Sequence, residues 1–364
     1  MNVLAILFLG NNKLNGSLPV SKSSALLVVD LSYNNLIGQS FPSWVSEQNL
    51  QLNLVANNFS IDSSDSSGLP SGLNCLQRGF PCHRDSPVYY NFMINCGGPQ
   101  TKISNGTVYE QDSEPLGTAT YYVTETNRWG VSNVGLKTQL VAASYLTGTN
   151  IPKYTISTSS PIRNTSDPTL FQTARISASS LRYYGLGLEN GNYTVKLEFA
   201  EQAILDESTR KSHGRRVFDI YIQDVLVAKD FDIRNETNRT SLVAIEMVYN
   251  AQVVSENYLE IHFFWAGKGT CCIPEEGTYG PLISAISATP EFKPTVSNKL
   301  PSTKKNRTGM IVGIVVSGGV LILLVLLFYI VQIRKRHNSD DDYDEGKLLT
   351  KAQLRKTQHN YIFI

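Results

Sequence analysis

Between Leu181 and Glu201 the chain passes from a glycine-rich segment into a run in which apolar and polar residues alternate. The apolar members of this run are Tyr193, Val195, Leu197 and Phe199, and the polar members between them are Thr194, Lys196 and Glu198. A period of two residues is typical of a β-strand with one buried face. Asn190-Gly191, just before the run, is a turn signal, and we expect a loop that carries Tyr183 and Tyr184 to precede the strand.

The same alternation recurs at short intervals across the middle of the chain. The segments that have it include Tyr89–Ile94, Val217–Ile222, Leu242–Val248, Leu259–Trp265 and Leu282–Ala288. Glycine and asparagine turns separate them, and no long segment has the 3.6-residue period of a helix. Many short strands between turns are typical of an all-β sandwich. We therefore predict a mainly β protein with an antiparallel β-sandwich over residues 89–290.

The N-terminal segment, residues 1–60, has a longer period. Leu9 and Asn12 recur as Leu31 and Asn34, and a third copy of the pattern reaches Asn57. Period and residue types match the leucine-rich repeat, in which each coil supplies one strand and leucines fill a core that is continuous between coils. We predict a short leucine-rich-repeat solenoid over residues 1–60.

No capping segment precedes these repeats, so we expect them to be truncated at the N-terminus. The apolar residues Val3–Leu9 are also compatible with the core of a signal peptide. We favour the repeat, because no basic residue precedes this segment and its leucines already fit the repeat pattern.

The distribution of cysteines indicates an oxidising compartment, because all five precede residue 273. Cys75 and Cys82 lie in a linker over residues 61–88, and we predict that they form a local disulfide that closes the repeats. A metal site is less favoured there, because only His83 is nearby.

The other three cysteines leave two pairings open. Cys96 can form a bridge with the Cys271-Cys272 pair, of which we take Cys272, or a strained bridge can join Cys271 to Cys272. Either pairing leaves one cysteine free or available to a partner chain.

Eight Asn-x-Ser/Thr sequons lie before residue 310 and none lies after it. They are Asn15, Asn58, Asn105, Asn164, Asn192, Asn235, Asn238 and Asn306. Eight sequons on one side of a boundary indicate a glycosylated, extracellular surface. The net charge of +1 leaves no basic surplus for phosphates, which argues against nucleic acid as a partner.

The boundary itself is an uncharged run, Met310–Val331. As a helix it would extend about 33 Å, enough to cross a bilayer core of about 30 Å. We predict a stalk over 291–309, a transmembrane helix over 310–332 and a cytoplasmic stub over 333–364. Basic residues flank the run on both sides, so the sequons and cysteines decide the orientation, with the N-terminus outside. Gly309, Gly313 and Ser317 form a small-residue series through which two spans can associate.

Six segments of the sandwich region resemble the malectin domain. They are Asn95-Cys96-Gly97-Gly98, Leu170-Phe171-Gln172-Thr173-Ala174-Arg175, Tyr184–Gly191, Phe199-Ala200-Glu201, Phe218-Asp219-Ile220-Tyr221 and Gly280–Ile286. The order of repeats, cysteine-flanked linker, malectin domain and span resembles the plant leucine-rich-repeat receptor-like serine/threonine kinases that have an extracellular malectin domain. The resemblance covers residues 1 to about 335 and implies a cell-surface receptor at the plasma membrane.

The kinase motifs that the resemblance implies are absent from this sequence. After the predicted span there is no glycine-rich loop, no V-A-I-K, no H-R-D and no D-F-G. Full-length members of the family are serine/threonine protein kinases, and truncation or altered splicing is the simplest explanation of the difference. Without a kinase, the chain would act by binding alone, as a decoy or modulator.

The residues that bind sugar in animal malectin are also replaced. The resemblance places a tyrosine where this chain has Ile176, an aromatic pair at Ala203-Ile204, and an aspartate near Thr278-Tyr279-Gly280. Sugars are held by aromatic stacking and orienting polar groups, so we expect that glucan site not to be retained. Tyr183, Tyr184 and Trp129 are candidates for a different ligand site, or else core residues at the sandwich edge. Glu275-Glu276 is a candidate replacement for the acid.

No catalytic, metal or cofactor site is predicted. The five histidines are scattered, and none has the spacing of a metal site or a nucleophile motif. We expect a receptor-like protein that binds a peptide or a cell-wall oligosaccharide, together with a co-receptor kinase. The alternatives are a malectin-type carbohydrate-binding membrane protein, a kinase-less decoy, and an extracellular hydrolase, for which a convincing carboxylate pair is missing.

Overall fold

The computed structural model describes residues 4–61, 71–136, 154–270, 279–298 and 322–334. The chain divides into two compact units, Met1–Leu300 and Pro301–Ile364. In the second unit residues 322–334 are helical, and most of the predicted span lies outside the described residues. No helix in the described ranges is both long and apolar enough to cross a membrane.

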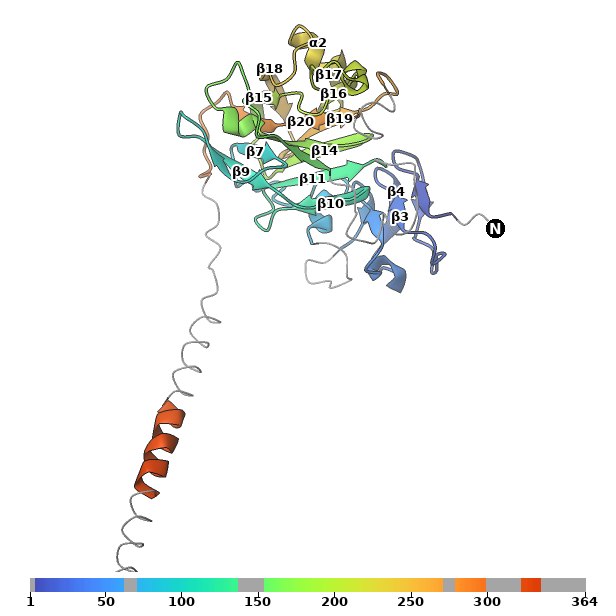
Figure 1. Ribbon diagram of the computed structural model, residues 1–364. Coiled ribbons are helices and arrows are strands. Elements are labelled where there is room, and N and C mark those ends of the chain that lie inside the picture. Colours follow the sequence, from blue (N-terminus) through green and yellow to red (C-terminus); the bar gives the residue numbers. More distant parts are fainter. Residues whose placement is uncertain (1–3, 62–70, 137–153, 271–278, 299–321, 335–364) are drawn as a thin grey trace, which may run out of the picture. The chain divides into compact units, whose positions relative to one another are not determined.

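Short parallel strands build the N-terminal part of the first unit (Figure 1). One sheet contains β1 (Ile6–Phe8), β3 (Val28–Asp30) and β5 (Gln51–Asn53), and the other contains β2 (Asn15–Gly16), β4 (Asn35–Gly38) and β6 (Asn58–Phe59). Ile6 pairs with Val28, and Val28 pairs in turn with Gln51. Paired residues are thus one sequence period apart, as Leu9 is from Leu31 and Leu31 from Leu54, so each period forms one coil.

Asparagine side chains join each coil to the one before it. Asn34 Nδ2 donates to the Leu9 carbonyl at 2.9 Å, while Asn34 Oδ1 accepts from the Leu14 amide at 3.0 Å. Asn57 makes the corresponding contacts one coil later, with the Leu31 carbonyl at 2.9 Å and the Leu36 amide at 3.0 Å. These bonds satisfy buried backbone groups at each turn, which explains why asparagine recurs with the period of the coils.

Two six-stranded sheets form the sandwich. The first has the order β10 (Ala119–Val123), β11 (Trp129–Val134), β14 (Ser180–Leu186), β19 (Tyr258–Phe264), β16 (Phe218–Ile222) and β17 (Val225–Phe231). The second has the order β18 (Ile245–Val254), β15 (Gly191–Phe199), β21 (Ala285–Pro290), β7 (Phe92–Cys96), β9 (Val108–Asp112) and β8 (Thr101–Lys102). Neighbours are antiparallel except β7 and β9, which run parallel.

A three-stranded sheet and several single helical turns complete the described elements. The sheet has the order β12 (Thr155–Ser157), β13 (Thr173–Ile176) and β20 (Leu282–Ile283). The 3-10 turns are η1 (Ser43–Ser46), η2 (Leu73–Leu76), η3 (Pro168–Phe171) and η4 (Arg210–His213), and one α-helical turn, α2, spans Ile233–Glu236. The structure is thus mainly β and contains a β-sandwich, as predicted.

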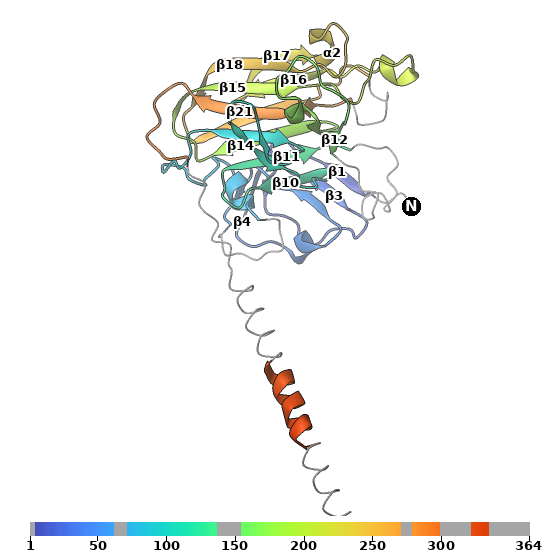
Figure 2. The same ribbon diagram turned by 60° about the vertical axis from the view of Figure 1, so that its left-hand side comes forward.

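The first sheet is buried on both faces over β10, β11 and β14. Its inner face packs against the second sheet in a core that contains Leu181, Tyr183, Phe199 and Phe263. Its outer face, over β10 and β14, packs against the coils in a second cluster that contains Tyr121, Tyr184, Leu186, Leu54 and Phe59. Figure 2 shows the resulting order of layers, with β15, β18 and β21 first, then β10, β11 and β14, and then β1 and β3.

This arrangement corrects the predicted loop before Gly191. Ser180–Leu186 form β14, which pairs with β11 on one side and β19 on the other. Its glycine and tyrosines therefore belong to a central strand. The segment Leu282–Ala288 was expected as one strand, but Leu282 and Ile283 pair with β13, whereas Ala285–Pro290 form β21 in the second sheet.

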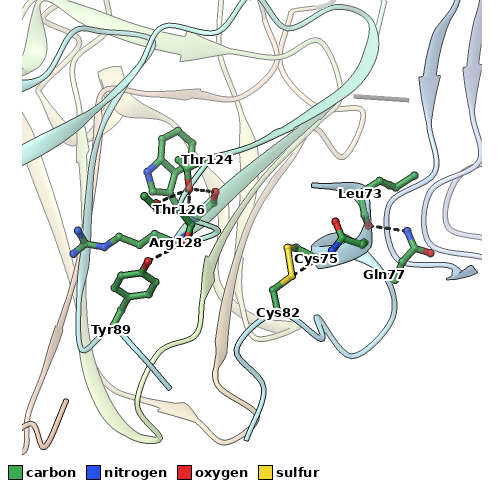
Figure 3. Close-up of a disulfide and its surroundings, with 10 residues drawn as sticks. Leu73, Cys75, Gln77, Cys82, Tyr89, Thr124, Thr126 and Arg128 are labelled. Atoms are coloured by element: carbon green, nitrogen blue, oxygen red, sulfur yellow. Dashed lines mark hydrogen bonds between the residues drawn. A yellow bond between two sulfur atoms is a disulfide. The ribbon is translucent and has the colours of Figure 1, made fainter. Parts of the chain in front are cut away.

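Cys75 and Cys82 form a disulfide between η2 and the following turn (Figure 3). In the same turn Gln77 donates to the Leu73 carbonyl at 3.1 Å and accepts from the Phe59 amide at 3.1 Å. Gln77 thus continues the contacts of Asn34 and Asn57 beyond the last coil. Cys96 has a free, buried thiol, and Cys271 and Cys272 lie outside the described residues.

Candidate functional site

The three aromatic residues proposed as ligand contacts are all fully buried. Trp129 donates from Nε1 to Glu110 Oε2 at 3.0 Å, and Tyr183 donates to Asp112 Oδ2 at 2.6 Å. Tyr184 lies on the opposite face of β14, where its hydroxyl is 2.9 Å from the hydroxyl of Tyr33. Because no ring has an exposed face, these residues cannot stack on a ligand in this structure, and they serve the two cores instead.

Some of the positions that the resemblance to malectin implies for sugar binding are similarly enclosed. Ile176 and Ile204 are fully buried, and Ala203 is half-buried. Thr278 and Glu275-Glu276 lie outside the described residues. Glu201, which ends the Phe-Ala-Glu motif, forms a buried ion pair with Arg216 at 2.7 Å. This carboxylate is therefore occupied in holding two segments of the sandwich together.

Tyr33 joins the coils to the sandwich. Its hydroxyl donates to Glu260 Oε1 at 2.8 Å, and the Arg182 guanidinium lies 3.8 Å from the centroid of its ring. Arg182 also forms an ion pair with Glu260. Burial raises the pKa of Glu260, while Arg182 and the Tyr33 hydroxyl oppose that rise. The cluster fixes one turn of the coils against β14 and β19 of the sandwich.

A cavity of about 590 Å³ opens beside this cluster, between the coils and the sandwich. We call it the junction cleft. The coils contribute Phe8, Gly10, Asn11, Asp30, Ser32 and Tyr33, and the sandwich contributes, among others, Ser180, Arg182, Tyr221, Asp224, His262, Phe264, Trp265 and Tyr279. The volume is within the ordinary range for small-ligand sites, about 300–1,000 Å³.

Half-buried aromatic rings form one wall of the cleft. Tyr221 and His262 stack at 5.6 Å between centroids with an interplanar angle of 26°, and His262 and Phe264 are 5.5 Å apart. Trp265, which follows β19, lies 4.7 Å from Tyr279. Such rings, only partly covered, are able to stack on an apolar ligand face.

Polar groups border the aromatic wall. Asp30 is buried and accepts bonds from Ser32, at 3.0 Å from the amide and 2.7 Å from the hydroxyl. Burial raises its pKa, and these hydrogen bonds and Arg182 oppose the rise. His262 Nε2 lies 2.9 Å from Ser180 Oγ. Burial, followed by Arg182, lowers the pKa of His262 well below its usual value, so the ring is neutral and acts as part of the wall.

The alternating pattern predicts the strands of this wall but not the site. His262 and Phe264 occupy alternating positions on β19, and Tyr221 lies beside His262 on β16. Aromatic residues at these outward positions were a usable signal. The cleft itself was not predictable in this way, because its lining comes from coils and strands that lie far apart in sequence.

All seven sequon asparagines in the described ranges are exposed, as glycosylation requires; Asn306 is not described. Among these seven, none lines the junction cleft. Asn105 and Asn164 line a second cavity, on the far sheet of the sandwich. Of these two cavities, the junction cleft is thus the one that glycans attached at these positions would leave open.

Comparison with known proteins identifies the domain. A family model described as malectin domain matches residues 90–286. Two probable LRR receptor-like serine/threonine-protein kinases of Arabidopsis thaliana are 52% and 53% identical to this chain over 302 and 274 residues. These matches cover 82% and 75% of this chain but 28% and 26% of the relatives, so the chain spans less than a third of their length.

Solved structures give a more distant similarity. The ANXUR1 extracellular domain from Arabidopsis thaliana aligns with a TM-score of 0.33 and 17% identity, covering 54% of this chain and 47% of that one. The plant receptor-like kinase FER aligns with a TM-score of 0.33 and 15% identity, over 54% and 48%.

Proposed function

Because this chain belongs to the malectin-type family of LRR receptor-like serine/threonine kinases, we propose that it is the ligand-binding ectodomain and anchor of such a receptor. The ligand binds in the junction cleft. A plasma-membrane location with the N-terminus outside is supported by the exposed sequons and by the Cys75–Cys82 disulfide, which suits an oxidising compartment. Protein kinase activity would be a property of the whole receptor, and we include it in this proposal only at that level.

We further propose that the parallel coils are leucine-rich repeats. The match between the strand offsets and the sequence period, and the asparagine bonds between coils, support this identification. The first coils and the sandwich would then contribute jointly to one site. A ligand in the junction cleft contacts both parts, so its binding energy depends on their relative position.

The aromatic wall of the cleft supports a proposal about the chemical class of the ligand. Tyr221, Phe264 and Trp265 offer partly covered ring faces, and Asp30 and Asp224 lie in the same cleft as acceptors. Sugars are recognised by this combination of stacking and hydrogen bonding. We therefore propose a short cell-wall oligosaccharide as the ligand. Of the positions that the resemblance to animal malectin implies, Tyr279 lines this cleft.

The test uses the full chain, produced in a glycosylating eukaryotic host. An array of plant cell-wall oligosaccharides is screened, and each binder is titrated by calorimetry. Trp265→Ala is expected to weaken binding about tenfold, since loss of a stacked ring and its contact area costs about 1–2 kcal/mol. The control is Tyr249→Ala, which is expected to leave the affinity unchanged. Tyr249 is half-buried on β18, outside the cleft.

A second candidate ligand is a basic peptide or a co-receptor with a basic segment. The observation that favours it is the negative charge of the cleft. Arg182 forms an ion pair with Glu260, and the carboxyl groups of Asp30 and Asp224 also line the cleft. If no oligosaccharide binds but a receptor kinase co-purifies in a Trp265-dependent manner, the oligosaccharide proposal fails and this second candidate replaces it. If neither depends on Trp265, the cleft is not the ligand site.

A further inference from the structure

A second cavity, of about 550 Å³, lies on the outer face of the sheet that contains β15, β18 and β21. Its floor includes Met93, Tyr109, Glu198 and Ser287, from four strands of that sheet. Leu170 and Phe171 of η3 and the turn around Asn105 form walls. Nothing in the proposed receptor function uses this cavity, which is on the sheet farther from the coils (Figure 2).

The floor contains a buried acid with an unused oxygen. Glu198 is 6% exposed, and its Oε2 has no hydrogen-bond partner. A buried polar atom left without a partner costs about 1–3 kcal/mol, so this oxygen is available to hydrogen-bond a group that enters the cavity.

Burial is the main factor that favours the neutral form of the Glu198 carboxyl. Lys196, on the same strand, is engaged by Glu246 of β18 at 2.8 Å, and Asp167 lies on the cavity wall. Burial raises the pKa of Glu198 to about 7, against the opposing effects of Lys196 and the Tyr109 hydroxyl. A neutral carboxyl is able both to donate and to accept a hydrogen bond, which suits a neutral polar ligand.

Two sequon asparagines lie at the rim. Asn164 is exposed, and its Nδ2 donates to the carbonyl of Ala244, which also lines the cavity, at 3.0 Å. An N-linked sugar replaces one hydrogen of this amide, and the other hydrogen can keep the bond to Ala244. A glycan attached here therefore starts at the cavity edge from a fixed position.

We propose that the N-linked glycan of Asn164 folds back into this cavity and that Glu198 hydrogen-bonds to its inner sugars. A sugar ring has an apolar face for Met93 and Phe171 and polar groups for Glu198 and Ser287. The tether holds the glycan at high local concentration, commonly in the millimolar range, so modest contacts suffice. The bound glycan covers the far sheet and satisfies the unused oxygen of Glu198.

The first test measures how fast a peptide-N-glycosidase releases each glycan from the native full chain, followed by mass spectrometry. Asn192 is the matched control, because it is an exposed sequon in the same sheet and does not line the cavity. The Asn164 glycan is expected to be released about tenfold more slowly, which corresponds to about 1.4 kcal/mol of contact. Equal rates, or no glycan at Asn164, would overturn the proposal.

The second test asks whether Glu198 acts through the glycan. Ser166→Ala removes the sequon but keeps the Asn164 side chain, and Glu198→Ala removes the carboxyl. Glu198→Ala is expected to accelerate release at Asn164 but not at Asn192, and the stability effects of the two changes are expected to be non-additive.

Additive effects would show that Glu198 and the glycan do not interact, and the proposal would fail. If the Glu198→Ala variant does not fold, the melting temperatures of the Ser166→Ala and Asn192→Gln variants are compared instead. A lower melting temperature for Ser166→Ala alone supports the inference, and equal melting temperatures contradict it.

Discussion

The Arg182 guanidinium stacks on the ring of Tyr33, with 3.8 Å between its central carbon and the ring centroid. The two residues come from different parts of the chain, the coils and the sandwich. Glu260 contacts both, through the ion pair with Arg182 and the hydrogen bond from Tyr33. This contact fixes the two walls of the junction cleft relative to each other.

Tyr33→Phe removes the hydroxyl that bonds to Glu260 and lies against the Tyr184 hydroxyl. Because these partners are buried, we expect the free energy of unfolding to fall by about 1–3 kcal/mol. Chemical denaturation of the full chain measures it. Tyr249→Phe is the matched control, since the Tyr249 hydroxyl is buried without a partner, and its removal is expected to be neutral or slightly stabilising. Equal losses in both variants would contradict the role given to Tyr33.

Gly97 requires the absence of a side chain for two reasons. Its φ of 72° is in the left-handed region, and an added Cβ would lie 2.8 Å from the Ala174 carbonyl oxygen. Gly106 has a φ of 89° but nothing within 4 Å. Gly106→Ala should therefore cost only the backbone strain, on the order of 1–3 kcal/mol, and Gly97→Ala clearly more. Thermal and chemical unfolding measure both, and equal costs would show that the contact with Ala174 relaxes freely.

The disulfide between Cys75 and Cys82 closes a short loop beside the last coil. We expect Cys82→Ala to lower the free energy of unfolding by about 2 kcal/mol, since the unfolded chain gains the entropy of an open loop. Wild-type protein kept under reducing conditions should have the same free energy of unfolding as the variant, because both then have Cys75 with a free thiol and an open loop. An unchanged stability after reduction would mean that η2 is held by its apolar contacts and by Gln77 alone.

Glu198 makes stability depend on pH in a defined direction. Its pKa is raised to about 7 in the folded protein, so between the ordinary glutamate value of about 4.3 and 7 the folded state binds more protons than the unfolded state. The contribution is present below this window and is lost as the pH rises through it. Glu198→Gln should remove this loss, which is on the order of 3–4 kcal/mol over the whole window.

Denaturation curves at pH 5, 6, 7 and 8 measure the effect. The control is Glu125→Gln, an exposed glutamate, which is expected to leave the profile of the wild type. If the Glu198→Gln profile parallels that of the wild type, the carboxyl is not the group that titrates in this window.

Local pattern predicted several of the strands that have one buried face. The alternation from Tyr193 to Phe199 falls within β15, Gly191–Phe199. It failed for Ser180–Leu186, where the coils cover the outer face of β14, so Arg182, Tyr184 and Leu186 are covered as well as Leu181 and Tyr183. Burial on both faces removes the polar alternation that marks a strand, and the glycines then suggested a loop.

The candidate site depended on contacts that no local pattern contains. Asp30 and Tyr33 were assigned to repeats, and His262 to a strand, each from its own neighbours in sequence. Their meeting in one cleft follows from the packing of the coils on β14. Trp129 and Tyr183 were candidates either for ligand contacts or for core residues at the sandwich edge, and the structure uses them to fill the sandwich.

The apolar cluster shared by the coils and the outer face of the sandwich also limits how such proteins can diversify. Leu54 and Phe59 on one side and Tyr184 and Leu186 on the other belong to the same cluster. A chimera that joins the coils of one relative to the sandwich of another would bring together surfaces that have not adapted to each other. Recombination between relatives should therefore preserve the coils and the sandwich as a single inherited block, and the two should evolve new ligand preferences together.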